Sequence, residues 1–363
     1  MKTLLTLLFA LIGLAQAQMP EVEHRVVYHR EDEFAAWPAN EGLWSWGDEV
    51  LVGFNVAKFE ERGNKHSLVG EMGVAFARSL DGGQTWTVER HANVQPPAKL
   101  ASPSRHQPSP GGIDFTHPDF AMKLRGRFFF TSTDRGHSWQ GAYRVPDFGQ
   151  DMDARTSYVV TGKSACLFFI PCTMNDGRGT RIRSCAVETT DGGESFHFLS
   201  WIGPDLIESL PKKSRTQEPY ISSTMPSVVR LDDGRLVCAL RNRIGRGKWS
   251  RIEESTDGGR TWTSVTTLEK GSTNPISLLH LGGNRLAAVY GNRRSVPCQL
   301  SAKLSDDGGR TWGNEITLRA DGRKWDLGYT RAALRPDGRI VILYYFSTAQ
   351  IPQQHIEAAI WRP

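Results

Sequence analysis

The stretch Ser255-Thr-Asp257-Gly-Gly259-Arg-Thr-Trp262 decides the fold, because close copies of it recur along the chain. Four more copies begin at Ser79, Ser132, Thr189 and Ser305, and successive aspartates lie 53, 57, 66 and 50 residues apart. In each copy the Asp side chain can accept hydrogen bonds from nearby backbone amides, glycine supplies positive φ, and an aromatic residue can pack onto a sheet. No copy has the regular oxygen ligands of an EF-hand calcium loop. We therefore predict five structural turns, called the aspartate turns below.

Paired strand patterns precede most of the aspartate turns. Segment 226–241 contains two apolar runs joined by Asp232-Asp233-Gly234, and segments 275–290 and 329–345 repeat this pattern. With a third strand before each turn and a fourth after it, one unit has four strands in about 55 residues, which is typical of a β-propeller blade. Residues 18–363 fit six such units. We predict an all-β chain that forms a single six-bladed β-propeller domain, with residues 22–28 pairing into the last blade.

The N-terminus has the pattern of a secretory signal peptide over residues 1–17. Lys2 gives a positive start, residues 4–14 form an apolar run, and Ala15-Gln16-Ala17 is a small-residue cleavage site. The run is too short to span a bilayer. We expect cleavage after Ala17, a secreted or periplasmic protein, and no membrane insertion.

Composition excludes several protein classes. The 363 residues are 39% hydrophobic and 10% aromatic, which excludes intrinsic disorder, and the five cysteines are too few for a disulfide-dense mini-protein. The cysteines lack metal-ligand spacing and are interpreted as buried hydrophobes, with room for one disulfide among Cys166, Cys172 and Cys185. The chain carries a net charge of +5, with 32 Arg against 12 Lys. This excess of arginine favours planar binding of carboxylate, sulfate or phosphate.

Five such turns in six predicted blades make the chain similar to the sialidase (neuraminidase) superfamily, also called the BNR or Asp-box proteins. The resemblance covers essentially all of residues 18–363. It implies a six-bladed propeller with Asp-box turns, whereas a fold alone does not imply the cleavage of sialic acid.

Blade topology locates the candidate site. The first strand of a blade starts, and the second strand ends, on the rim opposite the aspartate turns, and long loops on a rigid scaffold are where function concentrates. The candidates at the starts of first strands are Trp37, His117, Asp119, Arg155, Tyr158, Met225, Asn274 and Tyr329. The candidates at the ends of second strands are Arg241, Arg243, Arg293 and Arg294.

The resemblance assigns roles to some of these residues. Sialidases hold the substrate carboxylate with three arginines, and a tyrosine assisted by a glutamate attacks the anomeric carbon while an aspartate is the acid/base. Tyr329, in Tyr329-Thr-Arg-Ala-Ala-Leu-Arg-Pro-Asp-Gly338, matches the nucleophile. Arg241 matches the second arginine, and Arg293 or Arg294 matches the third.

Other positions depart from the sialidase pattern. The first arginine is absent from Ala36-Trp37-Pro38, its supporting glutamate falls at Tyr345, and Arg155 could replace the lost contact. The glutamate beside the nucleophile aligns with Met225, and Glu218 is the nearby substitute. The acid/base falls in the loop of His66, where His66, Glu60 or Glu61 could serve.

Three functions follow from these residues. The first is a secreted sialidase-like glycoside hydrolase that acts on an acidic, carboxylate-bearing sugar at a glycan terminus. The second is a polysaccharide lyase for uronate-containing glycans, in which arginine neutralises the carboxylate and His66, His117, Tyr158 or Tyr329 moves the proton. The third is a propeller that binds carbohydrate without catalysis, with Trp37, Trp44 and Trp46 as stacking platforms.

In each case the expected partner is an acidic glycan or oligosaccharide. The sequence contains no nucleotide motif, no metal-ligand cluster and no Ser-His-Asp arrangement, so no cofactor and no metal site are implied. Because the arginines are dispersed along the blades rather than clustered, we expect no nucleic-acid partner.

Overall fold

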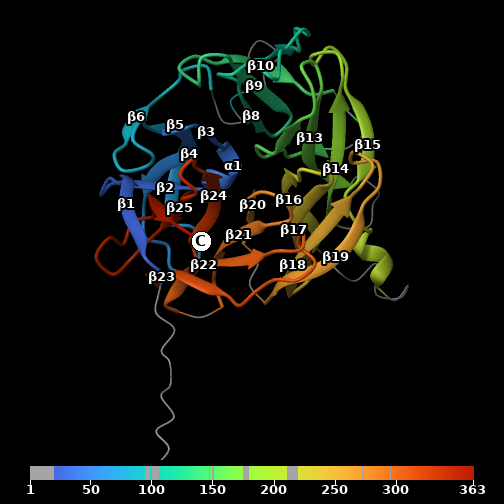
Figure 1. The fold of residues 1–363 in the computed structure, drawn as a ribbon. Coiled ribbons are helices and arrows are strands. Elements are labelled where there is room, and N and C mark those ends of the chain that lie inside the picture. Colours follow the sequence, from blue (N-terminus) through green and yellow to red (C-terminus); the bar gives the residue numbers. More distant parts are fainter. Residues whose placement is uncertain are drawn as a thin grey trace, which may run out of the picture.

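The structure is a computed structural model, and it describes residues 20–94, 99, 106–146, 148, 151–174, 180–210, 220–271, 274–294 and 296–363. The described chain is all-β, with one short helix, α1 (Pro38–Glu41), and one 3-10 turn, η3 (Leu206–Ser209). Its strands form five hydrogen-bonded sheets, which lie around a common centre in Figure 1. No described helix has both the length and the apolar character needed to cross a membrane.

The strands fall into six groups along the chain, and the first three occupy the N-terminal half. Group one contains β2 (Glu33–Ala36), β3 (Leu43–Trp46), β4 (Glu49–Phe59), β5 (Leu68–Ser79) and β6 (Thr87–Glu89). Group two contains β7 (Gln107–Pro108), β8 (Ala121–Arg125), β9 (Phe128–Ser132) and β10 (Gln140–Arg144). Group three contains β11 (Asp151–Met152), β12 (Tyr158–Val160), β13 (Cys166–Met174), β14 (Thr180–Thr189) and β15 (His197–Trp201).

The last three groups follow the same order. Group four contains β16 (Tyr220–Arg230), β17 (Leu236–Ile244), β18 (Gly247–Ser255) and β19 (Thr263–Lys270), and its β16 pairs in parallel with β14 to join groups three and four. Group five contains β20 (Ser277–His280), β21 (Leu286–Asn292), β22 (Cys298–Ser305) and β23 (Ile316–Gly322). Group six contains β24 (Gly328–Leu334), β25 (Ile340–Phe346), β26 (His355–Trp361) and β1 (Val22–Tyr28).

Strands from the two ends of the described chain complete group six. β1 pairs antiparallel with β26, from Val22 opposite Trp361 to Tyr28 opposite Ile356. The predicted pairing of residues 22–28 with the last unit is confirmed.

Hydrophobic cores fill the spaces between consecutive groups. Continuous apolar strands such as β25, whose seven residues are all buried, can pack against a neighbouring group on each face. One cluster joins Phe54 of group one to Tyr345 of group six, and another joins Leu300 of group five to Ile342 of group six. Further clusters lie between groups one and two, two and three, three and four, and four and five.

The five aspartate turns share one hydrogen-bond pattern. The hydroxyl at the first position accepts from the backbone N–H of the glycine at the fifth position at 2.8–2.9 Å in every copy, as Ser255 does from Gly259. The Asp carboxylate accepts from the hydroxyl four residues later, as Asp257 does from Thr261 at 2.6 Å. These contacts stay within the turn, in agreement with a structural role.

All five cysteines are buried free thiols. The Cys172 and Cys185 sulfur atoms lie 3.7 Å apart without a disulfide bond. The interpretation as small buried hydrophobes therefore describes the structure, and the disulfide that the sequence allowed is not formed.

Candidate functional site

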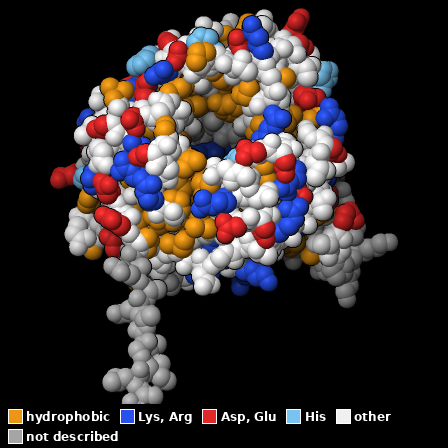
Figure 2. All heavy atoms as spheres, viewed as in Figure 1, with side chains coloured by type: hydrophobic (Ala, Val, Ile, Leu, Met, Phe, Trp, Pro, Cys, Tyr) orange, Lys and Arg blue, Asp and Glu red, His pale blue; other side chains and the backbone are white. Residues whose placement is uncertain are grey.

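A cavity of about 290 Å³ lies at the end of the sheets opposite the aspartate turns. Figure 2 shows a hollow near the centre of one face, with Lys and Arg side chains inside and around it. The residues predicted for the site that line this cavity, called the site cavity below, are Trp37, His66, Arg155, Met225, Arg241 and Tyr329. Asn40, Arg125 and Asp153 also line it.

Tyr329 stands at the start of β24 with a positive φ of 46°. Arg241, on β17, donates from Nη1 to the Tyr329 hydroxyl at 3.1 Å, and the Arg293 guanidinium lies 5.6 Å from the centre of the Tyr329 ring. Burial alone would raise the pKa of Tyr329, but the positive charges of Arg241 and Arg293 outweigh it, so the pKa lies below the ordinary value of 10.0. This phenol is therefore easier to ionise than a free tyrosine.

Arg293 and Arg294 point to different places. Arg293 donates to the Leu327 carbonyl and, at 3.1 Å, to the Tyr345 hydroxyl, which keeps it beside Tyr329. Arg294 donates to a Glu315 carboxylate oxygen at 2.5 Å and does not line the site cavity. Of the two predicted alternatives, the structure brings Arg293 to Tyr329.

His66 forms a pair with a buried aspartate that sequence reasoning missed. Its Nδ1 lies 2.8 Å from Oδ1 of Asp326, whose side chain is 0% exposed. Asp326 also accepts from the Tyr345 hydroxyl at 2.6 Å. Because a carboxylate oxygen faces Nδ1, this nitrogen carries a proton, and Nε2 is the nitrogen left to exchange a proton with a bound molecule. Asp326 lies only three residues before Tyr329, and this proximity was the available signal.

Trp37 covers one side of His66. It has a positive φ of 63°, and its ring meets the His66 ring edge-on at 5.1 Å. Of the other two predicted stacking platforms, Trp44 is buried against Trp139 in the core between groups one and two. Trp46 packs against the same core. The stacking role predicted for Trp44 and Trp46 is wrong.

Two further arginines line the site cavity, each held by acids. Arg155 donates from Nε to Asn40 at 2.9 Å and from Nη2 to Asp153 at 2.8 Å. Arg125, at the end of β8, lies 3.3 Å from a Glu41 carboxylate oxygen. Arg155 was predicted, whereas Arg125 was missed.

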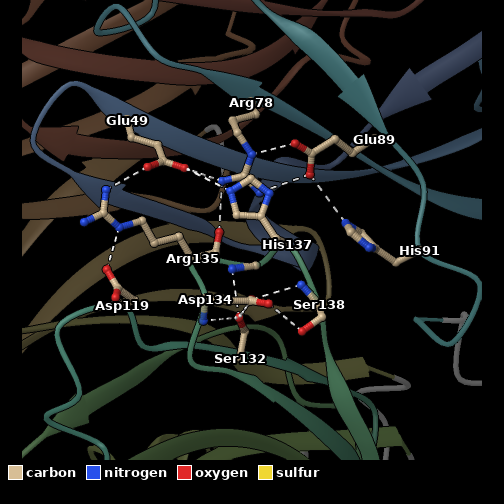
Figure 3. A network of polar contacts seen from close by, with 11 residues as sticks. Glu49, Arg78, Glu89, His91, Asp119, Ser132, Asp134, Arg135, His137 and Ser138 are labelled. Carbon is tan, nitrogen blue, oxygen red and sulfur yellow. Dashed lines mark hydrogen bonds and ion pairs between the residues drawn. The ribbon is translucent and has the colours of Figure 1, made fainter.

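His117 and Asp119 lie at the opposite end of the molecule from the site cavity, and their predicted placement is wrong. β9 runs directly into the aspartate turn at Ser132, so β8 before it is equivalent to a second strand rather than a first. The segment that precedes β8 therefore lies beside the turns. Asp119 accepts from Nε of the turn residue Arg135 at 2.6 Å (Figure 3). His117 Nδ1 accepts from the Asp119 backbone N–H at 3.1 Å.

The same shift of strand order explains why Arg125 was missed. When β8 is read as the second strand of its group, Arg125 becomes its last residue and lies near the end of a second strand, as Arg241 does on β17 in group four.

Tyr158 is also displaced from its predicted place. It lines a separate cavity of about 300 Å³, and its hydroxyl accepts from the Met122 backbone N–H at 3.4 Å. The expected glutamate partner of Tyr329 is replaced by Met225, which has a positive φ of 55°. Glu218 lies outside the described residues. Glu61, a predicted substitute for the acid/base, pairs with Arg323 and Lys324 instead.

Comparisons with known proteins identify several that share this architecture. A solved structure of a protein of unknown function from Dyadobacter fermentans superimposes with a TM-score of 0.71 at 22% identity, covering 95% of this chain and 100% of that one. The Hadza microbial sialidase Hz136 superimposes with a TM-score of 0.60 at 16% identity, covering 91% of this chain and 66% of that one. The phage phi92 endosialidase superimposes with a TM-score of 0.58 at 9% identity, covering 94% of this chain and 69% of that one. A comparison with curated protein sequences gave no match.

These likenesses show a shared fold. A family model described as the BNR repeat-like domain matches residues 107–342. This chain belongs to the BNR repeat-like family and shares its fold with sialidases.

Proposed function

We propose that this protein is a carbohydrate-active enzyme, a sialidase-like glycoside hydrolase that removes an acidic, carboxylate-bearing sugar from the end of a glycan. The observation that carries this proposal is the Tyr329 phenol held 3.1 Å from Arg241 and beside Arg293 in the site cavity. The sialidases among the structural neighbours share the fold and support the substrate class.

The scaffold proposed for this activity is a closed six-bladed β-propeller over residues 18–363. The hydrophobic clusters between every pair of consecutive groups, including the sixth and the first, support a closed ring. So do the contacts of β24 with β20 and β3, and of β16 with β12 and β20. We further propose that residues 1–17 direct export and are then removed.

Arg241 is the principal carboxylate ligand in this proposal. It forms no ion pair with any described residue, whereas Arg155 pairs with Asp153 and Arg125 shares Glu41 with the buried Lys123. A substrate carboxylate would supply the missing counter-charge. A charge-assisted hydrogen bond of this kind contributes about 1.5–3 kcal/mol.

Tyr329 and His66 have suitable chemistry for a two-step hydrolysis. The Tyr329 oxygen, ionised more readily beside two arginines, would attack the anomeric carbon while the protonated His66 gives its proton to the leaving oxygen. Neutral His66 would then take a proton from water as the water attacks the anomeric carbon and the bond to Tyr329 breaks. Asp326 would hold the imidazole in orientation throughout.

A second candidate is a lyase that cleaves beside a uronate. It is favoured by the His66–Asp326 pair together with Met225 in place of a carboxylate near Tyr329. Here Arg241 would neutralise the uronate carboxylate, and one of His66 and Tyr329 would remove the α-proton. The other would give a proton to the glycosidic oxygen, which leaves as an alcohol while the double bond forms.

The test is incubation with a panel of sialylated and uronate-containing glycans, with released sugar and ultraviolet absorbance measured together. Release of a free acidic monosaccharide supports hydrolysis, and an absorbing unsaturated product supports the lyase. Binding without either product indicates a carbohydrate-binding protein and contradicts both enzymatic proposals.

An Arg241→Gln variant tests the substrate class. We expect its affinity for the acidic sugar to fall about 10-fold or more, with no change for neutral sugars. Arg294→Gln is the matched control, because Arg294 pairs with Glu315 outside the site cavity. Equal affinities of wild type and Arg241→Gln for the acidic sugar would contradict the proposed clamp.

A further inference from the structure

A second cavity of about 300 Å³, called the inner cavity below, is lined by residues of β12, β16, β20 and β24, which are called the inner strands below. It is lined by Ser157, Tyr158, Ser227, Ser277 and Arg331, among others. A small space of about 10 Å³ lies next to both cavities, because it shares Arg155 and Met225 with the site cavity and Ser227 and Arg331 with the inner cavity.

Arg331 brings a positive charge into the inner cavity without an acid to balance it. It forms no ion pair with any described residue, and its Nε is buried without a hydrogen-bond partner. Its Nη2 donates to the carbonyl oxygen of Ala39 at 2.8 Å and to that of Thr156. These two hydrogen bonds hold the guanidinium in place beside the inner cavity. Carbonyl dipoles orient the group but do not neutralise its charge.

The remaining ionisable group of the inner cavity does not supply a counter-charge. Burial raises the pKa of Tyr158 well above its ordinary value, so its phenol stays neutral. Burial lowers the pKa of Arg331 only to about 10, so its guanidinium stays charged at neutral pH. An uncompensated charge in a partly buried place is unfavourable unless an ion of opposite sign joins it.

Three serines from three neighbouring groups line the inner cavity. Ser157 precedes β12, Ser227 is on β16 and Ser277 is on β20, and all three residues are buried. The Ser227 hydroxyl oxygen accepts from the Leu278 backbone N–H at 3.0 Å, which leaves its proton free to donate. The hydroxyls of Ser157 and Ser277 form no hydrogen bond with the described residues, so both can serve a ligand.

We propose that the inner cavity binds a small tetrahedral oxyanion, sulfate or inorganic phosphate, between Arg331 and the hydroxyls of Ser157, Ser227 and Ser277. A guanidinium presents planar donors to such an ion, and three hydroxyls from separate groups can donate to its other oxygens. The bound ion would join the inner strands of groups three to six. Because Arg331 lies two residues after Tyr329 on β24, the ion would also stabilise the strand that carries the proposed nucleophile.

The test is to bind selenate and sulfate to full-length mature protein that carries Arg241→Gln, which weakens anion binding in the site cavity. A crystal soaked in selenate should show an anomalous peak beside Arg331. Calorimetric titration with sulfate should show one site, whose affinity falls about 10-fold or more in the added Arg331→Gln variant.

Ser277→Ala keeps the test decisive if Arg331→Gln fails to fold, because no described residue depends on that hydroxyl. We expect it to weaken sulfate binding by about 3-fold to 10-fold and to reduce the rise in melting temperature that sulfate causes. Ser45→Ala is the control and should bind sulfate as its parent does, because the Ser45 hydroxyl donates to the Gly47 carbonyl at 3.4 Å and Ser45 does not line the inner cavity. Unchanged binding in Ser277→Ala, or an anomalous peak only elsewhere, would overturn the proposal. Neither outcome depends on turnover, so this proposal can fail while the enzymatic one holds.

Discussion

The two ends of the sheets differ in whether their residues repeat from group to group. At one end, five aspartate turns repeat the same contacts from copy to copy, and each turn is closed within eight residues of sequence. At the other end, the site cavity is lined by residues that do not repeat. Tyr329, Arg241 and His66 come from three different groups and meet only because the sheets surround a common centre.

This difference separates stability from chemistry along the chain. A repeated local turn fixes where each sheet ends, and its loss affects one group. A unique side chain in the site cavity adds little to the fold, but no second copy can replace it. Substitutions at the two ends should therefore change different measured quantities.

The largest effect is expected at Tyr329. Tyr329→Phe removes the oxygen that would attack or accept a proton, and we expect turnover to fall about 10²-fold to 10⁴-fold or more. The melting temperature should change little because the ring still fills its place. Tyr158→Phe, in the inner cavity, is the control and should keep near-normal turnover. If Tyr329→Phe turns over substrate like the wild type, the chemistry belongs to other residues.

A smaller loss is expected when the partner of His66 is changed. Asp326→Asn keeps the size of the buried side chain but removes the negative oxygen beside Nδ1, so the imidazole loses its fixed orientation. We expect kcat to fall about 10-fold to 10²-fold with little change in KM. His66→Ala made in this background should add less loss than it causes alone, as expected for two residues that act together. Fully additive losses would show that Asp326 does not act through His66.

The aspartate turns should respond in stability and not in turnover. Hydrogen bonds from the Thr261 hydroxyl and backbone lower the pKa of Asp257 from 3.8 to about 2. The unfolded chain therefore binds this proton first as the pH falls, and the stabilisation, complete above about pH 4, is lost between about pH 4 and pH 2. Asp257→Asn should lower the melting temperature at pH 7 by about 2 °C and make the decline below pH 4 shallower. A change in turnover beyond about twofold would contradict the separation of the two ends.

The smallest effect is expected at His117. Its ring bonds to the Asp119 backbone beside the aspartate turns, far from the site cavity, so His117→Ala should leave turnover within about twofold of the wild type. Steady-state kinetics on the substrate found in the glycan panel would measure this. A large loss of turnover would show that His117 belongs to the site and would contradict the strand order assigned to group two.

The sequence predicts the repeated end far better than the unique end. Each aspartate turn contains its own donors and acceptors, so its position and hydrogen bonds can be read locally. Tyr329 and Arg241 could be found because each lies where a regular hairpin starts or ends. His117, Asp119 and Arg125 were misplaced or missed because the described residues of group two include no regular first strand, so counting strands from the turn gave the wrong order.

Asp326 was missed for another physical reason. Apart from the nearness of Asp326 to Tyr329 in the sequence, no local pattern marks it, because the histidine, tyrosine and glutamine that contact its carboxylate lie elsewhere in the chain. Only the folded structure brings His66, 260 residues away, to the same carboxylate.

The pairing of β1 with β26 sets how the molecule resists a pulling force. Val22 and Trp361, the residues nearest the two ends of the chain in that ladder, lie opposite each other, so force applied at the termini loads this one pair first. When force is applied at one end of an antiparallel ladder, its hydrogen bonds break one pair after another and do not all bear the load together. Mechanical unfolding should therefore begin in group six with the release of residues 22–28 at low force, ahead of any aspartate turn.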